Sequence, residues 1–366
     1  MNDDHRKEKV LVVQPYGIGD AIFMLPFLKA LKSREGVERI DAIVGLRTKP
    51  IIENCPYVDD ILVIDKDKWK AQGNLKTGLE KYAILRKLGK THYTLLVDVS
   101  MQPEYSFWAK FYFKIPVRIG FNYKNRSRFL NRTVDLPKEG FVNKHIIEYY
   151  ADMAALIGVD IKDKKPEIDI SPTAMITAKT LLGSYGVSLP RYVVIAPGGG
   201  ITWGREGAFR HWPLAYFAEL TALIREVYAF DNVVVIGSQN ENPMGEVLGK
   251  QIKGLVNLCG KTNITEAAAI LKMAKLFIAS DGGLVHLAVS QDVPLITFYG
   301  PPDPRVYGPY PLNDKIAVMT KNISCRPCYQ NFRMNAACPT HACMNELKPR
   351  EVFEELLRDG FFKKLS

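Results

Sequence analysis

Short apolar segments with the length of buried strands alternate with helix-like segments along most of the chain, and this alternation restricts the fold more than any other feature. We expect strands at residues 10–14, 40–44, 61–64, 95–99, 192–196, 233–236, 276–279 and 295–298. Helical spacing of apolar residues follows the first of them at 21–31. Apolar strands separated by helices are typical of parallel sheets covered on both faces. The fold class is therefore α/β and doubly wound.

The pattern occurs twice. It pauses near residues 136–140, a helix is expected at 144–156, and the charged stretch 160–172 is interpreted as a linker. A length of 366 residues suits two such domains. We expect an N-terminal domain at 1–172, a second domain at 173–348, and a C-terminal helix within 349–366 that is free to pack back on the first domain. Ligands of doubly wound sheets bind beyond the carboxyl ends of the strands, so two facing domains would enclose a central cleft.

Composition excludes several classes of protein. Hydrophobic residues make up 47% and charged residues 24%, which is ordinary for a folded domain and argues against disorder. The N-terminus is polar, and no apolar run reaches the length of a membrane span, so we expect a cytoplasmic protein. Six cysteines in a chain of this length do not indicate a disulfide scaffold.

The positive charge is concentrated in the first half. The net charge is +10, and residues 1–150 hold 26 Lys/Arg against 18 Asp/Glu. Within 114–132 lie six cations and no acid: Lys114, Arg118, Lys124, Arg126, Arg128 and Arg132. Such a surface attracts anions, such as nucleic acid, anionic lipid or a phosphorylated or carboxylated substrate. The alternative is a solvated loop.

The first strand runs into a glycine-rich turn that precedes a helix. Gly17 and Gly19 permit a tight turn and a close approach of ligand to the helix N-terminus. A dinucleotide fingerprint would need a third glycine where Ile22 stands, so a nicotinamide enzyme is disfavoured. Asp20 fits two roles: a helix N-cap, or a carboxylate at the cleft floor that accepts a proton from a hydroxyl.

Two motifs in the second half suit a nucleotide. The strand at 192–196 leads into Gly198 and Gly199, and Arg210 follows, a combination that can hold phosphate groups. Glu241 lies just beyond the end of another strand, where it would bind a ribose diol or be a solvated turn residue.

A third motif lies at the start of a helix. Asp281, Gly282 and Gly283 end a strand and begin the helix, whose first backbone N–H groups are free to face a ligand. His286 lies on the first turn and can donate to an oxyanion, although a lone histidine is more often structural.

Four of the six cysteines fall within 19 residues. They are Cys325, Cys328, Cys338 and Cys343, with His341 as a spare ligand. Clustered thiolates can close a tetrahedral zinc or iron site, which here would be structural and away from the chemistry. The alternatives are free buried thiols, or disulfides formed only on oxidation.

Together these motifs resemble glycosyltransferase family 9, the ADP-heptose:lipopolysaccharide heptosyltransferases, over nearly the whole chain. The matching pieces are residues 14–20, Leu25-Pro26, residues 118–121, Pro197-Gly198, residues 210–213, residues 281–288 and residues 299–301. The resemblance implies a GT-B architecture that binds a nucleotide-sugar donor on the C-terminal domain and the acceptor on the N-terminal domain. It also implies inversion at the anomeric carbon without a catalytic metal.

The resemblance also suggests residue roles. Asp20 aligns with the family's general base, and Arg210 falls where the family usually has a lysine facing the donor phosphates. Glu241 aligns with a ribose-binding acid. The run Asp281, Gly283 and His286 aligns with a donor motif in which Gly282 replaces the usual threonine. We expect Gly198 and Gly199 to complete the donor site, and Gly19, Arg118, Lys124, Arg126 and Arg128 to contact the acceptor.

The expected reaction is transfer of a heptose or related sugar from an ADP-activated donor to an anionic lipopolysaccharide core. No catalytic cofactor is expected, and the basic N-terminal half would suit peripheral contact with the inner face of the cytoplasmic membrane. The alternatives are a same-fold transferase for another nucleotide sugar or acceptor, a nucleotide-sugar epimerase, and a non-catalytic binding protein. Nucleic-acid binding is disfavoured because no recognised nucleic-acid-binding motif is present.

Overall fold

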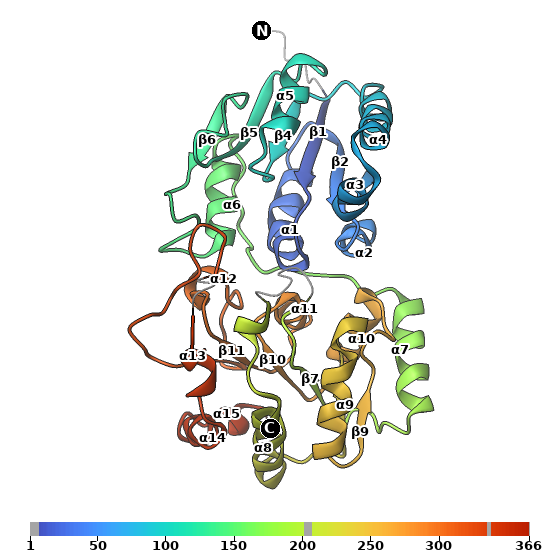
Figure 1. Ribbon diagram of the computed structural model, residues 1–366. Helices are drawn as coiled ribbons and strands as arrows, with labels where there is room; N and C mark the ends of the chain where they lie inside the picture. The colour runs from blue at the N-terminus through green and yellow to red at the C-terminus, as the bar shows by residue number, and fades with distance from the viewer. Residues whose placement is uncertain (1–6, 201–206, 335–337, 366) are drawn as a thin grey trace. The chain divides into compact units, whose positions relative to one another are not determined.

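The computed structural model describes residues 7–200, 207–334 and 338–365. The chain forms two compact units, Met1–Pro166 and Glu167–Ser366, and each contains one sheet with its covering helices (Figure 1). We call them the first and the second unit. The boundary between the units lies inside the polar stretch 160–172.

The first unit is built on a six-stranded parallel sheet of order β3-β2-β1-β4-β5-β6. Its strands are β1 (Glu8–Gln14), β2 (Val37–Gly45), β3 (Asp60–Ile64), β4 (Leu95–Asp98), β5 (Val117–Asn122) and β6 (Arg132–Asp135). Its helices are α1 (Ile18–Lys32), α2 (Lys49–Glu53), α3 (Lys66–Gln72), α4 (Asn74–Leu88), α5 (Pro103–Phe111) and α6 (Ile146–Ala155).

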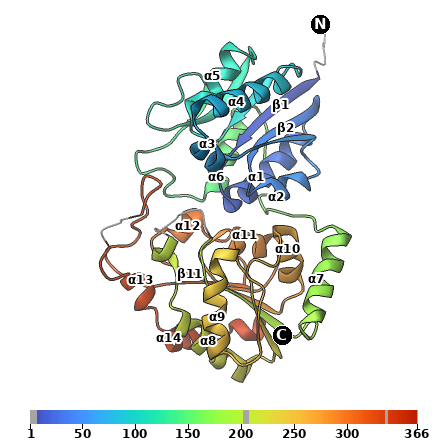
Figure 2. The same ribbon diagram turned by 45° about the vertical axis from the view of Figure 1, so that its right-hand side comes forward.

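Two helix layers cover this sheet. On one face, apolar residues of β1 to β4 form a buried cluster with Leu88 of α4 and with Tyr105 and Ala109 of α5. Trp69 of α3 packs against the same cluster, so α3, α4 and α5 form one layer (Figure 2). Helix α1 packs on α6 as a separate pair. The unit thus has the doubly wound form expected from alternating strands and helices.

The second unit repeats this architecture with the sheet order β12-β11-β10-β7-β8-β9, again parallel throughout. Its strands are β7 (Tyr192–Ala196), β8 (Asn232–Val235), β9 (Leu255–Asn257), β10 (Leu276–Ser280), β11 (Leu295–Tyr299) and β12 (Ile316–Thr320). Its helices are α7 (Pro172–Ser184), α8 (Leu214–Val227), the 3₁₀ turn η2 (Gln239–Glu241), α9 (Asn242–Gln251), α10 (Ile264–Lys272), α11 (Gly283–Ser290), α12 (Pro304–Tyr307), α13 (Ala342–Asn345), α14 (Pro349–Arg358) and α15 (Phe361–Lys364).

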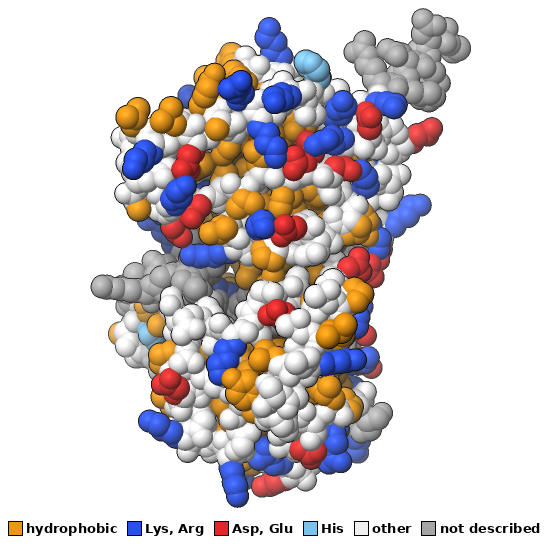
Figure 3. All heavy atoms as spheres, turned by 90° about the vertical axis from the view of Figure 1, so that its right-hand side faces the viewer, with side chains coloured by type: hydrophobic (Ala, Val, Ile, Leu, Met, Phe, Trp, Pro, Cys, Tyr) orange, Lys and Arg blue, Asp and Glu red, His pale blue; other side chains and the backbone are white. Residues whose placement is uncertain are grey.

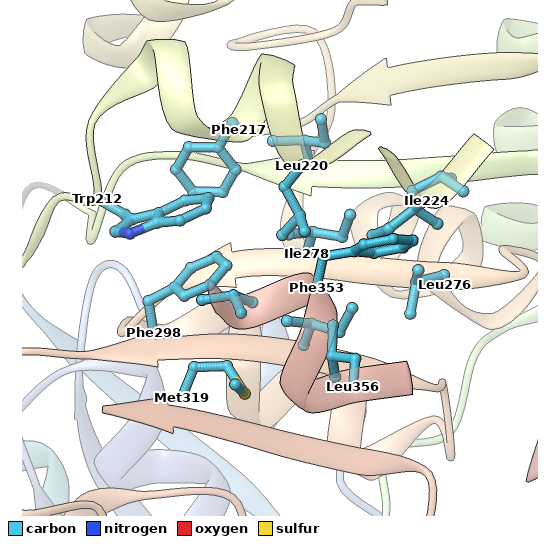
Figure 4. Close-up of a cluster of buried hydrophobic side chains, with 14 of the residues drawn as sticks. Trp212, Phe217, Leu220, Ile224, Leu276, Ile278, Phe298, Met319, Phe353 and Leu356 are labelled. Carbon is cyan, nitrogen blue, oxygen red and sulfur yellow. The ribbon is translucent and has the colours of Figure 1, made fainter. Parts of the chain in front are cut away.

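Trp212 anchors the core of the second unit. Its indole stacks on Phe298 of β11 with ring centroids 3.9 Å apart and planes 14° from parallel (Figure 4). The indole N–H donates to the Leu347 carbonyl at 2.8 Å, and the Trp212 backbone N–H donates to Ser280 Oγ at 3.1 Å. These contacts hold the segment just before α8 against the ends of β10 and β11.

The C-terminal helix belongs to the same core. Val352, Phe353 and Leu356 of α14 are buried in the cluster that contains Trp212, and α14 packs on α8. From the sequence, this helix could also have packed on the first domain. In the structure its apolar face is used within the second unit.

The order of the strands determines which loops are neighbours. In the first unit β1 lies between β2 and β4, and in the second unit β7 lies between β8 and β10. At each of these points the connections leave in opposite directions, and ligands of such sheets bind beyond the carboxyl ends of the strands there. The loops after β1 and β4, and those after β7 and β10, are therefore the candidate binding loops.

The eight strands expected from the sequence are all present, with ends shifted by at most three residues. The structure adds four that the sequence pattern did not indicate: β5, β6, β9 and β12. Two of them correct the interpretation of 114–132 as a solvated loop, because β5 lies inside this segment and β6 begins at its last residue. β6 is short, mostly polar and at least partly exposed, and in β5 the buried Ile119 and Phe121 alternate with other residues, so neither strand shows the continuous apolar run of a buried parallel strand.

None of the helices in the described part of the chain has the length and apolar character needed to span a bilayer.

Candidate active site

Asp20 lies on the first turn of α1, directly after β1. Its Oδ2 accepts a hydrogen bond from the Gly17 N–H at 3.1 Å, and Gly17 itself is the N-cap residue. Asp20 is therefore the third residue of the helix rather than its N-cap, which corrects the simpler structural interpretation. The half-buried carboxylate is held at the carboxyl end of β1, as the role of proton acceptor requires. Gly19 lies beside it in the same turn.

Sequence reasoning missed a second carboxylate, Asp98 at the end of β4. Asp98 is 3% exposed, and its Oδ1 accepts hydrogen bonds from the Ser100 N–H at 2.9 Å and the Ser100 hydroxyl at 2.5 Å. Burial raises the pKa of the Asp98 carboxyl to about 6, although the hydrogen bonds from Ser100 oppose the rise. The sequence does show an acid at the end of a buried strand. Asp98 belongs to the site, however, only because β4 lies beside β1.

Tyr16 joins these two loops. Its hydroxyl donates to the Ser100 carbonyl, so the loop after β1 is tied to the loop after β4. Burial raises the pKa of the Tyr16 phenol, and the charges of Asp98 and Asp20 raise it further. Both carboxylates thus lie within electrostatic reach of one phenol. The Tyr16 N–H donates to Gln14 Oε1 at 2.8 Å, while the buried Gln14 Nε2 has no hydrogen-bond partner among the described residues.

The cations of residues 114–132 fall into two groups, one that is hydrogen-bonded to the backbone and one that is exposed. The guanidinium of Arg118 donates to the carbonyls of Phe129, Ile115 and Pro116, so it holds the β5–β6 connection together. Arg118 therefore has a structural role, and any contact that it makes with the acceptor would be in addition to this role.

Lys124, Arg126 and Arg128 are exposed on the β5–β6 connection. The Arg128 guanidinium lies 4.7 Å from the centroid of the Phe129 ring. Arg126 lowers the pKa of Tyr16 and thus lies within electrostatic reach of the loop after β1. Of the three exposed cations, Arg126 is thus the one whose charge acts on the loop after β1.

In the second unit, Glu241 lies against the glycine-rich loop after β7. Its Oε2 accepts from both the N–H and the hydroxyl of Ser238 at 2.7 Å, and its Oε1 accepts from the Gly200 N–H at 3.3 Å. A Cβ atom at Gly198 would lie 1.9 Å from Glu241 Oε1, so only glycine permits this approach. Glu241 is therefore a positioned side chain and not a solvated turn residue.

The most buried charges of the second unit are Arg210 and Asp281. The guanidinium donates from Nε to Asp281 Oδ2 at 2.8 Å and also from Nη2 to the same oxygen. The side chains are 9% and 1% exposed. Burial lowers the pKa of Arg210 and the Asp281 carboxylate raises it, with a net rise. Asp281 Oδ1 is buried and accepts no hydrogen bond from the described part of the chain.

Close approaches between backbone segments complete the arrangement around Arg210 and Asp281. Gly282 is the N-cap of α11, and a Cβ atom there would lie 3.0 Å from the Gly199 carbonyl oxygen. A Cβ atom at Gly199 would lie 2.9 Å from the Asp281 carbonyl oxygen. The loop after β7 and the start of α11 therefore touch through glycines, and the first N–H groups of α11, from Gly283 onward, lie beside them. His286 lies on the same helix and is 6% exposed.

The structure adds two neighbours that the sequence did not single out for a role. Burial lowers the pKa of His211, and the charge of Glu241 opposes this shift, so the imidazole lies near that carboxylate. Burial raises the pKa of Tyr299, and the charge of Asp281 raises it further. His211 is contributed by the segment that Trp212 anchors, and Tyr299 by the end of β11.

The four clustered cysteines lie within electrostatic reach of one another. Among the described residues, no three His, Cys, Asp or Glu side chains come together in a group able to hold a metal ion. Burial raises the pKa of the Cys343 thiol to about 11, and the charges of Cys328, Cys338 and Cys325 contribute to the rise. Cys325 is exposed and Cys343 buried. The zinc or iron site expected from the spacing stays a prediction.

Comparison with known proteins shows the family of the chain. Residues 81–337 match the family model of glycosyltransferase family 9 (heptosyltransferase). The chain is 27% identical to lipopolysaccharide heptosyltransferase 2 of Salmonella typhimurium over 363 residues, which cover 95% of this chain and 97% of that protein.

Two solved structures share the fold. The ADP-heptose lps heptosyltransferase II of E. coli superposes with a TM-score of 0.72 at 21% identity, covering 98% of this chain and 100% of that one. An E. coli heptosyltransferase solved with ADP-2-deoxy-2-fluoro heptose superposes with a TM-score of 0.68 at 19% identity. The match covers 96% of this chain and 99% of that one. The expected GT-B class, with two doubly wound units, is confirmed by these neighbours and by the two sheets. The chain belongs to glycosyltransferase family 9 and is a glycosyltransferase.

Proposed function

We propose that this glycosyltransferase moves a heptose from an ADP-activated donor to an anionic lipopolysaccharide core acceptor, with inversion and without a catalytic metal. One observation carries the proposal: in a chain of this family, Gly198, Gly199, Arg210, Glu241 and residues 281–286 converge beyond β7 and β10. The names of the relatives given above support heptose as the sugar and lipopolysaccharide as the product class.

The second unit, which includes residues 173–348, binds the donor in this proposal. The amides at the start of α11 and the charge of Arg210 attract the diphosphate, which gains negative charge as the sugar leaves. His286 donates to a phosphate oxygen. Glu241 and the unused Oδ1 of Asp281 accept hydrogen bonds from sugar hydroxyls.

The first unit, within residues 1–172, binds the acceptor. Asp20 takes the proton from the acceptor hydroxyl while that oxygen forms a bond to the anomeric carbon. The bond from this carbon to the diphosphate breaks at the same time, and ADP leaves with the electron pair. A single displacement of this kind inverts the anomeric centre. General-base assistance typically contributes a factor of about 10²–10⁴ to such a step.

The acceptor contacts are assigned by charge. A lipopolysaccharide inner core is rich in carboxylate and phosphate, and Lys124, Arg126 and Arg128 are exposed cations of the first unit. We assign them, with Gly19, to the acceptor. Arg118 stabilises the loop that carries them, because its donors are used by backbone carbonyls. A lipid-linked acceptor would bring the reaction to the inner face of the cytoplasmic membrane.

The test is transfer by the purified chain from ADP-heptose to inner-core lipopolysaccharide prepared from a heptose-deficient strain. We expect ADP release and a product with inverted anomeric configuration, at a rate unchanged by EDTA. UDP- and GDP-sugars should be poor donors. Faster transfer from one of these sugars, retention of configuration, or loss of activity in EDTA would overturn the corresponding part of the proposal. Donor epimerisation without transfer would favour the epimerase alternative.

A further inference from the structure

Helix α4 presents apolar side chains on the side facing away from the sheet. Leu75, Leu79 and Tyr82 are 81%, 63% and 59% exposed. Their spacing of four and three residues places them on one face of the helix. The opposite side is already used, because Leu88 is buried against the sheet and Ile84 packs beside it. A helix that simply faced water would carry polar residues in this row.

Helix α5 adds an exposed aromatic group. Phe107 and Phe111 are 45% and 54% exposed, and Phe129 from the β5–β6 connection lies 5.3 Å and 5.7 Å from their ring centroids. The Lys110 ammonium lies 5.1 Å from the Phe111 centroid, and the Arg128 guanidinium covers Phe129. Three aromatic rings are thus mixed with two cations.

The two helices form one surface. Lys81 of α4 pairs with Glu104 of α5 at 2.6 Å and lies 6.0 Å from the Trp108 ring centroid. At the end of α4, a Cβ atom on Gly89 would lie 3.5 Å from the ring of Tyr112, which follows α5. Figure 2 shows α4 and α5 side by side in one layer. We call the outer side of this layer, with residues 123–131, the α4–α5 face.

The segments that carry this face are strongly basic. Residues 74–90 and 103–132 contain twelve Lys/Arg and two acids, and the remaining sequence contains 37 of each sign. Both acids are already paired, Glu80 with Lys68 and Glu104 with Lys81. Figure 3, which views the side of the molecule where α4 lies, shows hydrophobic side chains over the first unit mixed with Lys and Arg and with fewer Asp and Glu.

We propose that the α4–α5 face docks on an anionic lipid bilayer. Leucine and aromatic side chains enter the interface between headgroups and acyl chains, and the surrounding cations bind headgroup phosphates. Stable attachment to a bilayer takes both apolar insertion and charge, and this face supplies both. A second copy is a poor occupant because it would bring the same positive charge, and an exposed leucine row offers little to nucleic acid.

The proposal deepens the proposed function, since a lipid-linked acceptor would be met at such a surface. Binding to a bilayer can nevertheless be measured without any sugar. Full-length protein is sedimented with vesicles of phosphatidylethanolamine and phosphatidylglycerol at 3:1, and with pure phosphatidylcholine vesicles. We expect at least tenfold tighter binding to the anionic vesicles and a loss of affinity as salt rises. Equal binding to both compositions would overturn the proposal.

Two sets of substitutions localise the contact. Leu75→Ser with Leu79→Ser and Phe111→Ser removes apolar groups, and Lys76→Gln with Arg86→Gln, Lys90→Gln and Lys110→Gln removes charge. Each set should weaken binding to the anionic vesicles at least tenfold, with unchanged circular dichroism. Matched controls on the second unit are Ile176→Ser with Leu312→Ser, both 65% exposed, and Lys253→Gln with Lys272→Gln. The controls should bind like the unmodified protein.

Other occupants have distinct signatures. Vesicle binding that both sets of face variants leave unchanged would overturn the proposal. Dimerisation lost with Leu75→Ser would identify a second copy instead, and tight binding of duplex DNA without vesicle binding would identify nucleic acid. Both sets of variants should keep normal turnover on a delipidated, soluble core oligosaccharide. If transfer fails for the unmodified protein while vesicle binding holds, the proposed function is wrong and the docking face stands.

Discussion

Arg210 donates two hydrogen bonds, from Nε and Nη2, to a single oxygen of Asp281, seventy-one residues further along the chain. The pair is almost completely buried and lies against Gly199, where the donor loop meets the start of α11. Arg210 therefore has a structural partner before any phosphate arrives. Its removal should affect both folding and donor binding.

Substitution Arg210→Ala should lower the free energy of unfolding of the second unit by about 3–5 kcal/mol, because it leaves a buried carboxylate without its cation. The double variant Arg210→Gln with Asp281→Asn should cost less, since neither remaining group carries a charge. Thermal unfolding measures both. The exposed pair Arg191–Asp231 is the control, and Arg191→Ala should cost less than about 1 kcal/mol. A single variant as stable as the double variant would contradict the prediction.

Substitution His286→Ala tests donor binding at a buried side chain on α11. Loss of a hydrogen bond to a charged phosphate typically costs about 1.5–3 kcal/mol, so ADP should bind roughly 10- to 150-fold more weakly. Isothermal calorimetry with ADP measures this directly. Unchanged ADP affinity in a folded variant would remove His286 from the donor site.

Substitution Asp20→Asn should lower turnover by roughly 100-fold or more while leaving ADP affinity nearly unchanged. An asparagine oxygen can still accept the hydrogen bond from the Gly17 N–H, so the start of α1 is preserved, but the amide cannot take a proton. The control is Asp65→Asn, which changes a carboxylate at the start of α3 in the same unit. Near-normal turnover in Asp20→Asn would mean that another group is the base.

Substitutions Arg126→Gln and Arg128→Gln should together raise the acceptor KM and flatten its dependence on salt, because two exposed cations no longer attract an anionic acceptor. The donor KM should not change. Arg305→Gln, a substitution at an exposed cation of the second unit, is the control. Arg118→Gln should instead lower stability, since its guanidinium holds three backbone carbonyls. An acceptor KM unaffected by the double change would show that these two cations of the β5–β6 connection do not contact the acceptor.

Asp98 should make the first unit less stable as the pH rises from 4 to 6. Burial raises the pKa of the Asp98 carboxyl from its usual 3.8 to about 6, so over this interval the unfolded chain loses a proton that the folded chain keeps. The contribution of Asp98 to the free energy of unfolding therefore falls through this window, by up to about 3 kcal/mol, and changes no further above it.

Asp98→Asn removes this effect and should be the more stable form at pH 7, with the difference absent at pH 3. Hydrogen exchange of peptides from β4 measures the local opening free energy at each pH. Asp135→Asn, at the exposed end of β6, is the control. A wild-type profile that Asp98→Asn leaves unchanged would show that Asp98 is not the titrating group.

The cysteines should react with a thiol reagent at rates that follow exposure and pKa. Cys325 is exposed and should react first, whereas Cys343 and Cys259, whose pKa values burial raises to about 11 and 12, should react last. Elemental analysis of protein purified without added metal accompanies the titration. Stoichiometric zinc or iron, with Cys325, Cys328, Cys338 and Cys343 all protected, would establish the structural metal site instead.

Local sequence was sufficient wherever a feature depends on near neighbours along the chain. The strand at 192–196 was predicted to the residue, because an uninterrupted apolar run bounded by polar turns has one stable environment in an α/β protein. The glycine-rich turns after β1, β7 and β10 could be recognised for the same reason, and so could the placement of Asp20 and His286 on first helical turns. Order and spacing of these short motifs were enough to indicate the family.

The tertiary structure decided which of these segments meet. Asp98 became part of the site only because β4 pairs with β1, which brings Ser100 to the Tyr16 hydroxyl across 84 positions of sequence. Arg210 acquired Asp281 as a partner in the same way. β5 and β6 escaped detection because neither has a continuous apolar run: β5 alternates apolar residues with others, including Arg118, and β6 is short and mostly polar. Contacts between distant segments depend on strand order, and strand order follows from packing of the whole sheet rather than from any local pattern.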